Sequence, residues 1–426
     1  MSAVALAARG ARAASRTLAT LSTAAKNGVL LELAARIEAG TLGVLAANAA
    51  DLATAAAGGL SSPKLQRLAL SAADVGQLSE RLRVIAALPD PVGVVTRESV
   101  VPTADGGLLR VRRVRAPLGV VAMIYEARPA VTIDAMALCF KAGNACILKG
   151  GKEADATNRA LAAIARAVLS DRGVPEAAMT QVTASSRDDL RELLTLKDDI
   201  DLVIPRGGRE LIEFVCAHSL IPTVQHFQGV CHIYVDGAAD LERAVEVCVT
   251  AKTSAPATCN AAECILVDRA VAVEFVPVLA AAYARAGVEV RGTEEVVSLA
   301  GGAGGGRIKL AAADDFGREF LDLIVAVRVV DGVEGAVAHI GEFGSNHTEA
   351  ILTRDTGPGG AAERFVGAVQ SSCVLVNAST RFNDGFQLGL GAEIGISTSR
   401  VHAYGPMGLE ELTTQRWVVE GSGQVR

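Results

Sequence analysis

The sequence predicts an α/β fold of at least two domains, in which parallel sheets are covered by helices. Segments typical of strands and helices alternate along most of the 426 residues, and this alternation indicates parallel sheets with helices on both faces. Half of the residues are hydrophobic but only 4% are aromatic, as in chains rich in helix and buried strand. A chain of this length can bury two or three substantial cores, so we expect more than one domain.

The first 90 residues are predicted to be helical. Their apolar residues recur at helical spacing, and breaks fall at Gly58-Gly59 and at Ser61-Ser62-Pro63. Residues 94–114 then alternate like a β-hairpin around a turn at 105–107. We therefore expect a helical start that is followed by a hairpin.

The first 26 residues contain basic but no acidic side chains, among them Arg9, Arg12 and Arg16. This composition is compatible with a mitochondrial targeting helix. The apolar period continues through Val29 to Ile37, however, and this continuity favours the first helices of the fold.

A first series of alternating strands and helices begins at Leu118. Each predicted strand is short and apolar, and a helical pattern follows it, as in the usual nucleotide-binding framework. The expected strands cover residues 119–125, 145–149, 180–183 and 202–204, and the expected helices cover residues 130–141, 154–169, 188–196 and 207–216.

A second series is long enough for a separate α/β domain. A glycine cluster at 301–306 lacks the strand-to-helix context of a phosphate-binding loop, so we predict a flexible surface loop there. The expected strands cover residues 232–235, 264–267, 288–291, 323–330, 350–352 and 372–376, and the expected helices cover residues 241–249, 270–286 and 332–340.

Charge and motif content exclude several classes of function. The net charge of −6 and the scattered Lys and Arg residues argue against a nucleic-acid partner. No run of about 18 uncharged apolar residues could span a membrane. The G-x-x-x-x-G-K-[ST] signature is absent, and so is G-x-G-x-x-G after a strand. A dinucleotide would therefore have to be bound in another way.

The cysteine and histidine content predicts no metal site. The eight cysteines form no C-x-x-C pair, and the six histidines form no H-E-x-x-H pair. Several cysteines lie in apolar elements, as thiols do in a reducing cytosol. We therefore expect a cytoplasmic protein without a structural or catalytic metal.

Cys259 is the candidate nucleophile. It lies in an irregular segment between the helix 241–249 and the strand 264–267, with Pro256 and small residues before it and Asn260 after it. Such a segment suits a nucleophile that is held in a fixed loop. The alternative is a buried, inert thiol, which is the commoner state of intracellular cysteines.

Two strand-to-helix turns are candidates for cofactor binding. An ammonium group and glycine backbone at the carboxyl edge of a parallel sheet, or a helix N-terminus, would suit a phosphate. The alternative is an ordinary turn with solvated side chains. The two turns carry Lys149, Gly150, Gly151 and Lys152 in the first, and Arg206, Gly207 and Gly208 in the second.

These segments occur in the order typical of the aldehyde dehydrogenase superfamily. Lys149 ends a strand, Gly207 and Gly208 follow a later strand, Cys259 lies some fifty residues beyond them, and Glu319 lies beyond Cys259. The chain therefore resembles that superfamily.

Within the superfamily, the resemblance is to the γ-glutamyl phosphate reductases, also called glutamate-5-semialdehyde dehydrogenases. It extends over essentially the whole chain, in blocks of ten or more residues. The blocks that carry it are GVVAMIYEARP (119–129), ALCFKAGNACILKGGKEA (137–154), IPRGG (204–208), HFQGVCHIYVD (226–236) and residues 376–413.

The resemblance implies an aldehyde dehydrogenase-like fold with three parts. A Rossmann-like NADP-binding domain would comprise 1–97 and 118–230, and an α/β catalytic domain would comprise 231–375. Residues 98–117 and 396–416 would form a small β arm whose strand edges pair with another subunit, so a homo-oligomer is expected. Residues 376–395 would return to the cofactor domain and the active-site cleft.

The resemblance also implies an activity. NADPH would reduce L-glutamyl 5-phosphate to L-glutamate 5-semialdehyde and phosphate through a thioester on Cys259, the second step of proline biosynthesis from glutamate. The chain looks like the stand-alone reductase, with functional coupling to glutamate 5-kinase as a further expectation. The alternatives are a CoA-acylating aldehyde dehydrogenase, which shares the thioester step, and an inactive binding or scaffold protein.

The resemblance gives Cys259 and its neighbour Asn260 catalytic positions, but two departures from ordinary aldehyde dehydrogenases stand out. Where those enzymes carry Trp-Asn-x-Pro, this chain has residues 126–129, so the usual oxyanion amide is missing. His226 stands in place of the glutamate that activates hydrolytic water. A reductase must spare its thioester, so His226 would instead protonate the nascent aldehyde or the leaving thiolate. The alternative is a structural histidine.

The substrate and cofactor residues implied by the resemblance carry matching charges. Phosphate and α-carboxylate groups favour guanidinium partners, although Arg381 could instead form a salt bridge between domains. Glu319 would bind the nicotinamide ribose, unless it is a solvated carboxylate, and Lys149 and Lys152 would bind the adenosine ribose and its 2′-phosphate. The implied substrate residues are Arg128, Asn377, Ser379, Thr380 and Arg381.

Overall fold

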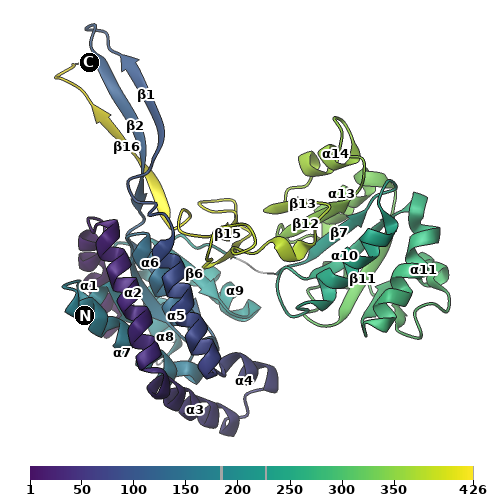
Figure 1. Cartoon of the computed structure of the whole chain (residues 1–426), viewed down its shortest axis with the longest axis horizontal. Helices are drawn as coiled ribbons and strands as arrows, with labels where there is room; N and C mark the ends of the chain where they lie inside the picture. Colours follow the sequence, from purple (N-terminus) through teal and green to yellow (C-terminus); the bar gives the residue numbers. More distant parts are fainter. Residues whose placement is uncertain (183–185, 226–227, 426) are drawn as a thin grey trace. The chain divides into compact units, whose positions relative to one another are not determined.

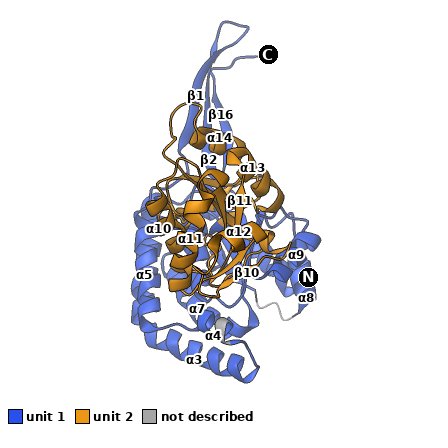
Figure 2. Ribbon diagram, turned by 90° about the vertical axis from the view of Figure 1, so that its right-hand side faces the viewer, with its two compact units in different colours: residues 1–225, 389–395, 407–426 blue, residues 226–388, 396–406 orange. Residues whose placement is uncertain are grey.

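Two parallel sheets organise the chain, one in each of the two units shown in Figure 2. Unit 1 comprises 1–225, 389–395 and 407–426, and unit 2 comprises 226–388 and 396–406. The structure is a computed structural model, in which residues 1–182, 186–225 and 228–425 are described.

Unit 1 begins with five helices, which confirms the helical start. Ser2, Ser22 and Ser71 cap three of them, because each side-chain oxygen accepts a hydrogen bond from a backbone N–H three residues on. Each of the first two helices buries one apolar face, which includes Leu18 in α1 and Leu30 in α2, so these helices are part of the fold. The helices are α1 (Ala3–Leu18), α2 (Thr23–Ala39), α3 (Thr41–Ala57), α4 (Ser62–Leu68) and α5 (Ala72–Ala87).

The sheet of unit 1 is parallel, with the strand order β5-β4-β3-β6. Its central strand β3 is buried along its whole length, which explains the unbroken apolar run in the sequence. The strands are β3 (Val120–Tyr125), β4 (Ala145–Lys149), β5 (Met179–Gln181) and β6 (Leu202–Arg206), and the helices that follow them are α6 (Ala130–Lys141), α7 (Asp155–Asp171), α8 (Arg187–Thr195) and α9 (Arg209–His218).

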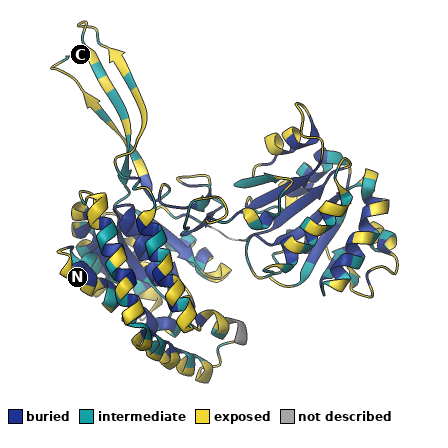
Figure 3. Cartoon of the chain, in the orientation of Figure 1, coloured by how far each residue is buried: buried dark blue, intermediate teal, exposed yellow. Residues whose placement is uncertain are grey.

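An antiparallel sheet projects from unit 1 (Figure 1). The hairpin β1 (Val95–Pro102) and β2 (Leu108–Pro117) pairs with β16 (Thr413–Glu420), and many of their side chains are exposed (Figure 3). The predicted arm segment 396–416 overlaps this third strand only at residues 413–416. Glycine and proline interrupt the sequence before Thr413, whereas 413–420 contains neither and is rich in β-branched residues. The short strands β14 (Gly395–Ser397) and β15 (Gly405–Met407) pair with each other instead.

Unit 2 contains a parallel sheet in the order β10-β9-β11-β8-β7-β12-β13. Three of its elements were not predicted, namely α12, β10 and α14, and each has at most eight residues. The strands are β7 (Cys231–Val235), β8 (Ala262–Asp268), β9 (Glu289–Gly292), β10 (Ile308–Leu310), β11 (Ile324–Val330), β12 (Thr348–Leu352) and β13 (Cys373–Val376). The helices are α10 (Leu241–Thr253), α11 (Arg269–Arg285), α12 (Glu294–Ala300), α13 (Gly332–Phe343) and α14 (Ala361–Ala368).

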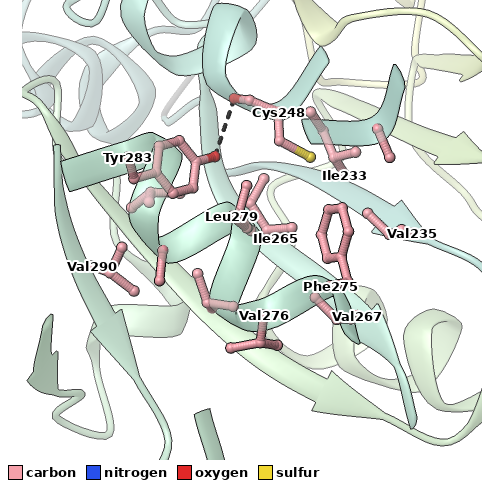
Figure 4. Packing of buried hydrophobic residues seen from close by; sticks show 14 of the residues in the cluster. Ile233, Val235, Cys248, Ile265, Val267, Phe275, Val276, Leu279, Tyr283 and Val290 are labelled. Carbon is pink, nitrogen blue, oxygen red and sulfur yellow. Dashed lines mark hydrogen bonds between the residues drawn. The ribbon is translucent and has the colours of Figure 1, made fainter. Parts of the chain in front are cut away.

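Helices cover both faces of this sheet, as the alternating pattern predicts. Figure 4 shows the core against α10 and α11, where Phe275 and Leu279 pack on the sheet and the Tyr283 hydroxyl donates to the Cys248 carbonyl at 3.1 Å. A second cluster, which includes Phe365, packs α13 and α14 on the other face. Within the described residues, no helix has the length and apolar character needed to cross a membrane.

Candidate active site

Cys259 lies in the loop between α10 and β8, residues 254–261, which we call the Cys259 loop. Two backbone hydrogen bonds fold this loop into turns, from Thr258 N–H to Ala255 O and from Ala261 N–H to Thr258 O. Cys259 is half-buried and all eight cysteines are thiols. The loop therefore presents a thiol from a fixed backbone, at the amino end of β8.

Gly229 packs directly against the backbone of Cys259. A Cβ atom at position 229 would lie 2.0 Å from the Cys259 carbonyl oxygen, so only glycine fits. The Cys231 thiol donates to the same oxygen at 3.2 Å. Sequence reasoning missed this contact, although a glycine just before a buried strand is a signal of close backbone approach. The predicted catalytic residue His226 lies outside the described residues.

The Asn260 side chain forms hydrogen bonds with the backbone around it. Its amide nitrogen donates to the carbonyl oxygens of Asn383 at 3.0 Å and of Arg381 at 3.4 Å, and its amide oxygen lies 3.0 Å from the Thr258 hydroxyl. The side chain is 4% exposed. Asn260 thus ties the Cys259 loop to the segment that carries Arg381.

Arg381 reaches the Cys259 loop through neutral partners. Its guanidinium donates to the Thr258 hydroxyl at 2.8 Å and to the Ser254 hydroxyl at 3.3 Å. No ion pair among the described residues includes it, so the alternative of a salt bridge finds no support in this part of the chain. A guanidinium held only by hydroxyls keeps its positive charge available for an anion.

The other predicted substrate residues of this segment have separate contacts. Asn377 adopts a left-handed conformation with φ 57°, and its amide oxygen accepts from the Thr353 N–H at 2.9 Å. Ser379 caps the short turn that contains Arg381, and Thr380 is buried. Arg381 is therefore the member of this segment whose side chain reaches the Cys259 loop, and the substrate roles of the other residues stay predictions.

Glu319 lies on the same side of unit 2 as the Cys259 loop. Burial raises the pKa of its carboxyl group, whereas a hydrogen bond from the Gly229 N–H and the charge of Lys252 lower it. Gly229 thus contacts both Cys259 and Glu319. The alternative of a fully solvated carboxylate does not hold, because Glu319 is half-buried.

In unit 1, Lys149 ends β4 and is half-buried. Burial lowers the pKa of its ammonium group, and the carboxylates of Glu153 and Glu126 act in the opposite direction. Gly150 follows, and a Cβ atom there would lie 2.2 Å from the Asn158 amide nitrogen. Gly151 and Lys152 lead into the short turn before α7.

At the carboxyl edge of the unit 1 sheet, two backbone N–H groups donate hydrogen bonds to carboxylates. Glu126 accepts from the Gly208 N–H at 3.0 Å, at the start of α9, and Glu153 accepts from the Ala127 N–H at 2.6 Å. Ala127 is left-handed, with φ 40°. A phosphate that approached the turn at 207–208 would therefore meet the Glu126 carboxylate first.

The two arginines of unit 1 that were predicted to bind substrate or cofactor, Arg128 and Arg206, have different surroundings. Arg206 ends β6, and its guanidinium lies so near Gly395 that a Cβ atom there would be 2.6 Å away. Arg128 is exposed in the segment between β3 and α6. Arg128 is therefore accessible to an anion, while Arg206 is partly covered by the returning chain.

The comparisons with known proteins identify the family. The aldehyde dehydrogenase family model matches residues 2–297. A γ-glutamyl phosphate reductase from Opitutus terrae is 51% identical over 425 residues, which cover 99% of this chain and 98% of that protein. The chain belongs to the γ-glutamyl phosphate reductase family.

Solved structures agree with this family. The crystal structure of a γ-glutamyl phosphate reductase from Thermotoga maritima matches with a TM-score of 0.94 and 38% identity, over 100% of both chains. A second relative found by sequence, a γ-glutamyl phosphate reductase from Xanthomonas axonopodis pv. citri, is 49% identical over 97% of both chains. An acetylating aldehyde dehydrogenase from Geobacillus thermoglucosidasius, at 17% identity and a TM-score of 0.66, shares the fold.

One group of side chains in the described part of this reductase-family chain has the size of a metal site. His232, Cys264 and His339 are buried, and their ligand atoms lie within 4.8 Å of one another. Arg328 donates to His339 Nδ1 at 3.2 Å, so a neutral His339 carries its proton on Nε2 and cannot offer that atom to a metal. Sequence spacing could not reveal this cluster, because its members come from three separate elements.

A surface hollow of about 660 Å³ lies at the other end of the unit 2 sheet. Its lining includes Arg269, Thr293 and Asp331, which directly follow β8, β9 and β11. Cys259, Gly229 and Glu319 precede β8, β7 and β11. The candidate site is therefore at the amino edge of this parallel sheet, and the hollow is separate from it.

Proposed function

We propose that this chain reduces L-glutamyl 5-phosphate to L-glutamate 5-semialdehyde and phosphate with NADPH, the second step of proline biosynthesis from glutamate. The observation that carries the proposal is the family, with relatives named γ-glutamyl phosphate reductase at 49–51% identity over almost the whole chain. The meeting of the Cys259 loop, Glu319 and Arg381 in unit 2 supports it, because acyl reduction needs a nucleophile, a cofactor contact and an anion partner.

In the proposed mechanism, the Cys259 thiolate attacks the acyl carbonyl carbon. The tetrahedral oxyanion would be stabilised by the Cys259 backbone N–H, and it collapses with loss of phosphate to leave a thioester. When bound, a nicotinamide cofactor would supply the hydride that reduces the thioester carbon. The C–S bond then breaks, so that the aldehyde leaves and the thiolate is restored.

Arg381 and Arg128 are the proposed partners of the substrate anions. Arg381 is the stronger candidate, because its hydrogen bonds to Thr258 and Ser254 place a guanidinium on the Cys259 loop. Asn260 would act as a positioning residue, since its side chain is bonded to neighbouring backbone. His226 would protonate the nascent aldehyde or the leaving thiolate, a role that rests on the sequence alone.

Each unit, taken by itself, carries residues that suit one part of a nicotinamide dinucleotide. Glu319 offers a half-buried carboxylate to a ribose, and Lys149 and Lys152 lie where a sheet strand ends. A 2′-phosphate would favour these lysines, so we propose NADP rather than NAD. Gly207, Gly208 and Arg206 would contact the phosphates only after Glu126 gives way.

We further propose a homo-oligomer that pairs through the β1-β2-β16 sheet, because two of its strand edges carry exposed Val100, Val101, Trp417 and Val419. Eight cysteine thiols agree with a reducing cytoplasm. Functional coupling to glutamate 5-kinase remains part of the proposal, since an acyl phosphate hydrolyses easily in water.

The test runs the reaction in reverse, as phosphate-dependent reduction of NADP with glutamate semialdehyde. We expect activity with phosphate, less with NAD in place of NADP, and none with coenzyme A in place of phosphate. Activity with coenzyme A alone would favour the CoA-acylating alternative. Cys259→Ser should lower kcat at least about 1,000-fold, because the serine hydroxyl is a far weaker nucleophile.

Cys216→Ser is the matched control, because this half-buried thiol lies on α9 in unit 1, and it should keep wild-type activity. Full activity of Cys259→Ser would overturn the proposed mechanism.

A further inference from the structure

A buried ion pair closes the base of the Cys259 loop. Lys252 Nζ lies 2.6 Å from Glu263 Oε2, and both side chains are 0% exposed. Lys252 belongs to the last turn of α10 and Glu263 is the second residue of β8. The ion pair therefore joins the end of the helix before the Cys259 loop to the start of the strand after it.

The second oxygen of Glu263 holds another segment. Glu263 Oε1 accepts from the Leu321 N–H at 3.4 Å, and the Phe320 N–H donates to the same carboxylate. Leu321 is left-handed, with φ 54°, a conformation that a branched aliphatic residue avoids unless its surroundings impose it. The carboxylate supplies such a restraint.

This restrained turn directly follows Glu319. The Glu319 carboxylate accepts from the Gly229 N–H, and Gly229 packs on the Cys259 backbone. The Lys252 charge favours the ionised form of Glu319, against the effect of burial. Glu263 thus fixes the backbone beside Glu319, and Lys252 acts on its charge.

We propose that Lys252 and Glu263 are positioning residues for the reaction, which hold the Glu319 carboxylate in register with the Cys259 loop. The pair does not touch substrate or cofactor in this proposal. The inference rests on the proposed function, in which Glu319 binds the nicotinamide ribose.

Removing one member of a buried pair leaves an uncompensated charge, so the test removes both. Lys252→Met with Glu263→Leu keeps the volume but loses the hydrogen bonds to Phe320 and Leu321. Lys252→Met with Glu263→Gln also removes the charges but retains a side-chain oxygen as an acceptor. We expect the Met/Leu variant to raise the KM for NADP roughly tenfold, with a smaller rise in the KM for semialdehyde. The Met/Gln variant should recover part of this loss.

A double-mutant cycle with Glu319→Gln separates positioning from a general structural role. If the pair acts through Glu319, the Met/Leu change should raise the KM for NADP much less in the Glu319→Gln background than in the wild type. Equal effects in both backgrounds, or an unchanged KM for NADP in the Met/Leu variant, would overturn the proposal.

The matched control is the buried pair Lys26 and Asp90 of unit 1, whose atoms lie 2.8 Å apart. Lys26→Met with Asp90→Leu should leave the KM for NADP unchanged. If both Lys252 Glu263 variants fail to fold while this control folds, the pair is structural and the proposal fails. Direct titration with NADPH, followed by its fluorescence, tests the pair even if the wild type shows no phosphate-dependent activity.

Discussion

In unit 1, the N–H groups of Gly208 and Ala127 at the sheet edge donate to the carboxylates of Glu126 and Glu153. In unit 2, the Arg381 guanidinium beside the Cys259 loop donates to two hydroxyl groups. The donors of the first region already have anionic partners that belong to the chain. Among the described residues, the Arg381 guanidinium of the second region has only neutral partners.

This difference predicts how each region binds an anion. An incoming phosphate in unit 1 must compete with a carboxylate or be repelled by it, so affinity there is reduced by the protein itself. Among the described residues, no carboxylate pairs with the Arg381 guanidinium. An anion that binds there would not have to displace a carboxylate, so its attraction to the guanidinium would contribute fully to its affinity. The first arrangement suits a cofactor that must leave after each turnover, and the second suits a substrate that is to be held for attack.

Arg381→Ala should produce the largest effect among the tests of this comparison. A charge-assisted hydrogen bond contributes about 1.5–3 kcal/mol, so the KM for phosphate or semialdehyde should rise about 10- to 150-fold. Arg381→Lys should recover only part of the loss, because an ammonium group lacks the fork of donors. Steady-state kinetics in the reverse direction gives both values.

Arg400→Ala provides the control for Arg381, since this unit 2 arginine donates to the Gln370 carbonyl away from the Cys259 loop. It should leave both KM values unchanged. An unchanged KM in Arg381→Ala would remove the basis for an anion site at Arg381.

Much of the framework follows from the sequence, and the reason is periodicity. The buried strand Val120–Tyr125 is a continuous apolar run, and the longer helices repeat their apolar faces over several turns. The helix Glu294–Ala300 and the strand Ile308–Leu310 are too short to show a period, so they were missed. The strand Thr413–Glu420 lies only partly within the predicted arm segment 396–416, because the bounds of that segment were inferred from the resemblance.

The candidate site shows a different limit. Cys259 and Arg381 could be singled out because each lies in a loop next to a predicted strand. A cysteine there suits a nucleophile, and an arginine suits an anion partner. Lys252 and Glu263 could not, since charged residues at a helix end and a strand start usually face solvent, and only the fold reveals their burial. Asn377 was grouped with Arg381 by proximity in sequence, whereas its left-handed backbone directs its amide to Thr353.

Glu126→Gln should sharpen the comparison with an effect of the opposite sign. Removing this carboxylate charge lowers the repulsion between the Gly208 turn and a phosphate, so NADP should bind more tightly, by roughly three- to tenfold at low salt. The gain should shrink as ionic strength rises. Titration of NADPH fluorescence at two salt concentrations measures both.

The matched control for this change is Glu213→Gln. It removes a surface carboxylate from α9, the helix that follows the Gly208 turn. It should change the affinity for NADP little. Weaker binding by Glu126→Gln would mean that the carboxylate supports the turn and does not compete with the cofactor.

Loss of the Lys149 charge should have the smallest effect on the affinity for NADP, and this effect should appear only at alkaline pH. Burial lowers the pKa of its ammonium group below the usual 10.5, although Glu153 and Glu126 oppose this shift. The charged form that attracts phosphate is present at neutral pH and is lost as pH rises through the lowered pKa. The affinity for NADP should therefore fall a few-fold before pH 10.5 is reached, in titrations between about pH 7 and 10. Lys149→Arg, which stays protonated throughout, should abolish this decline, and a decline that persisted unchanged in Lys149→Arg would assign it to another group.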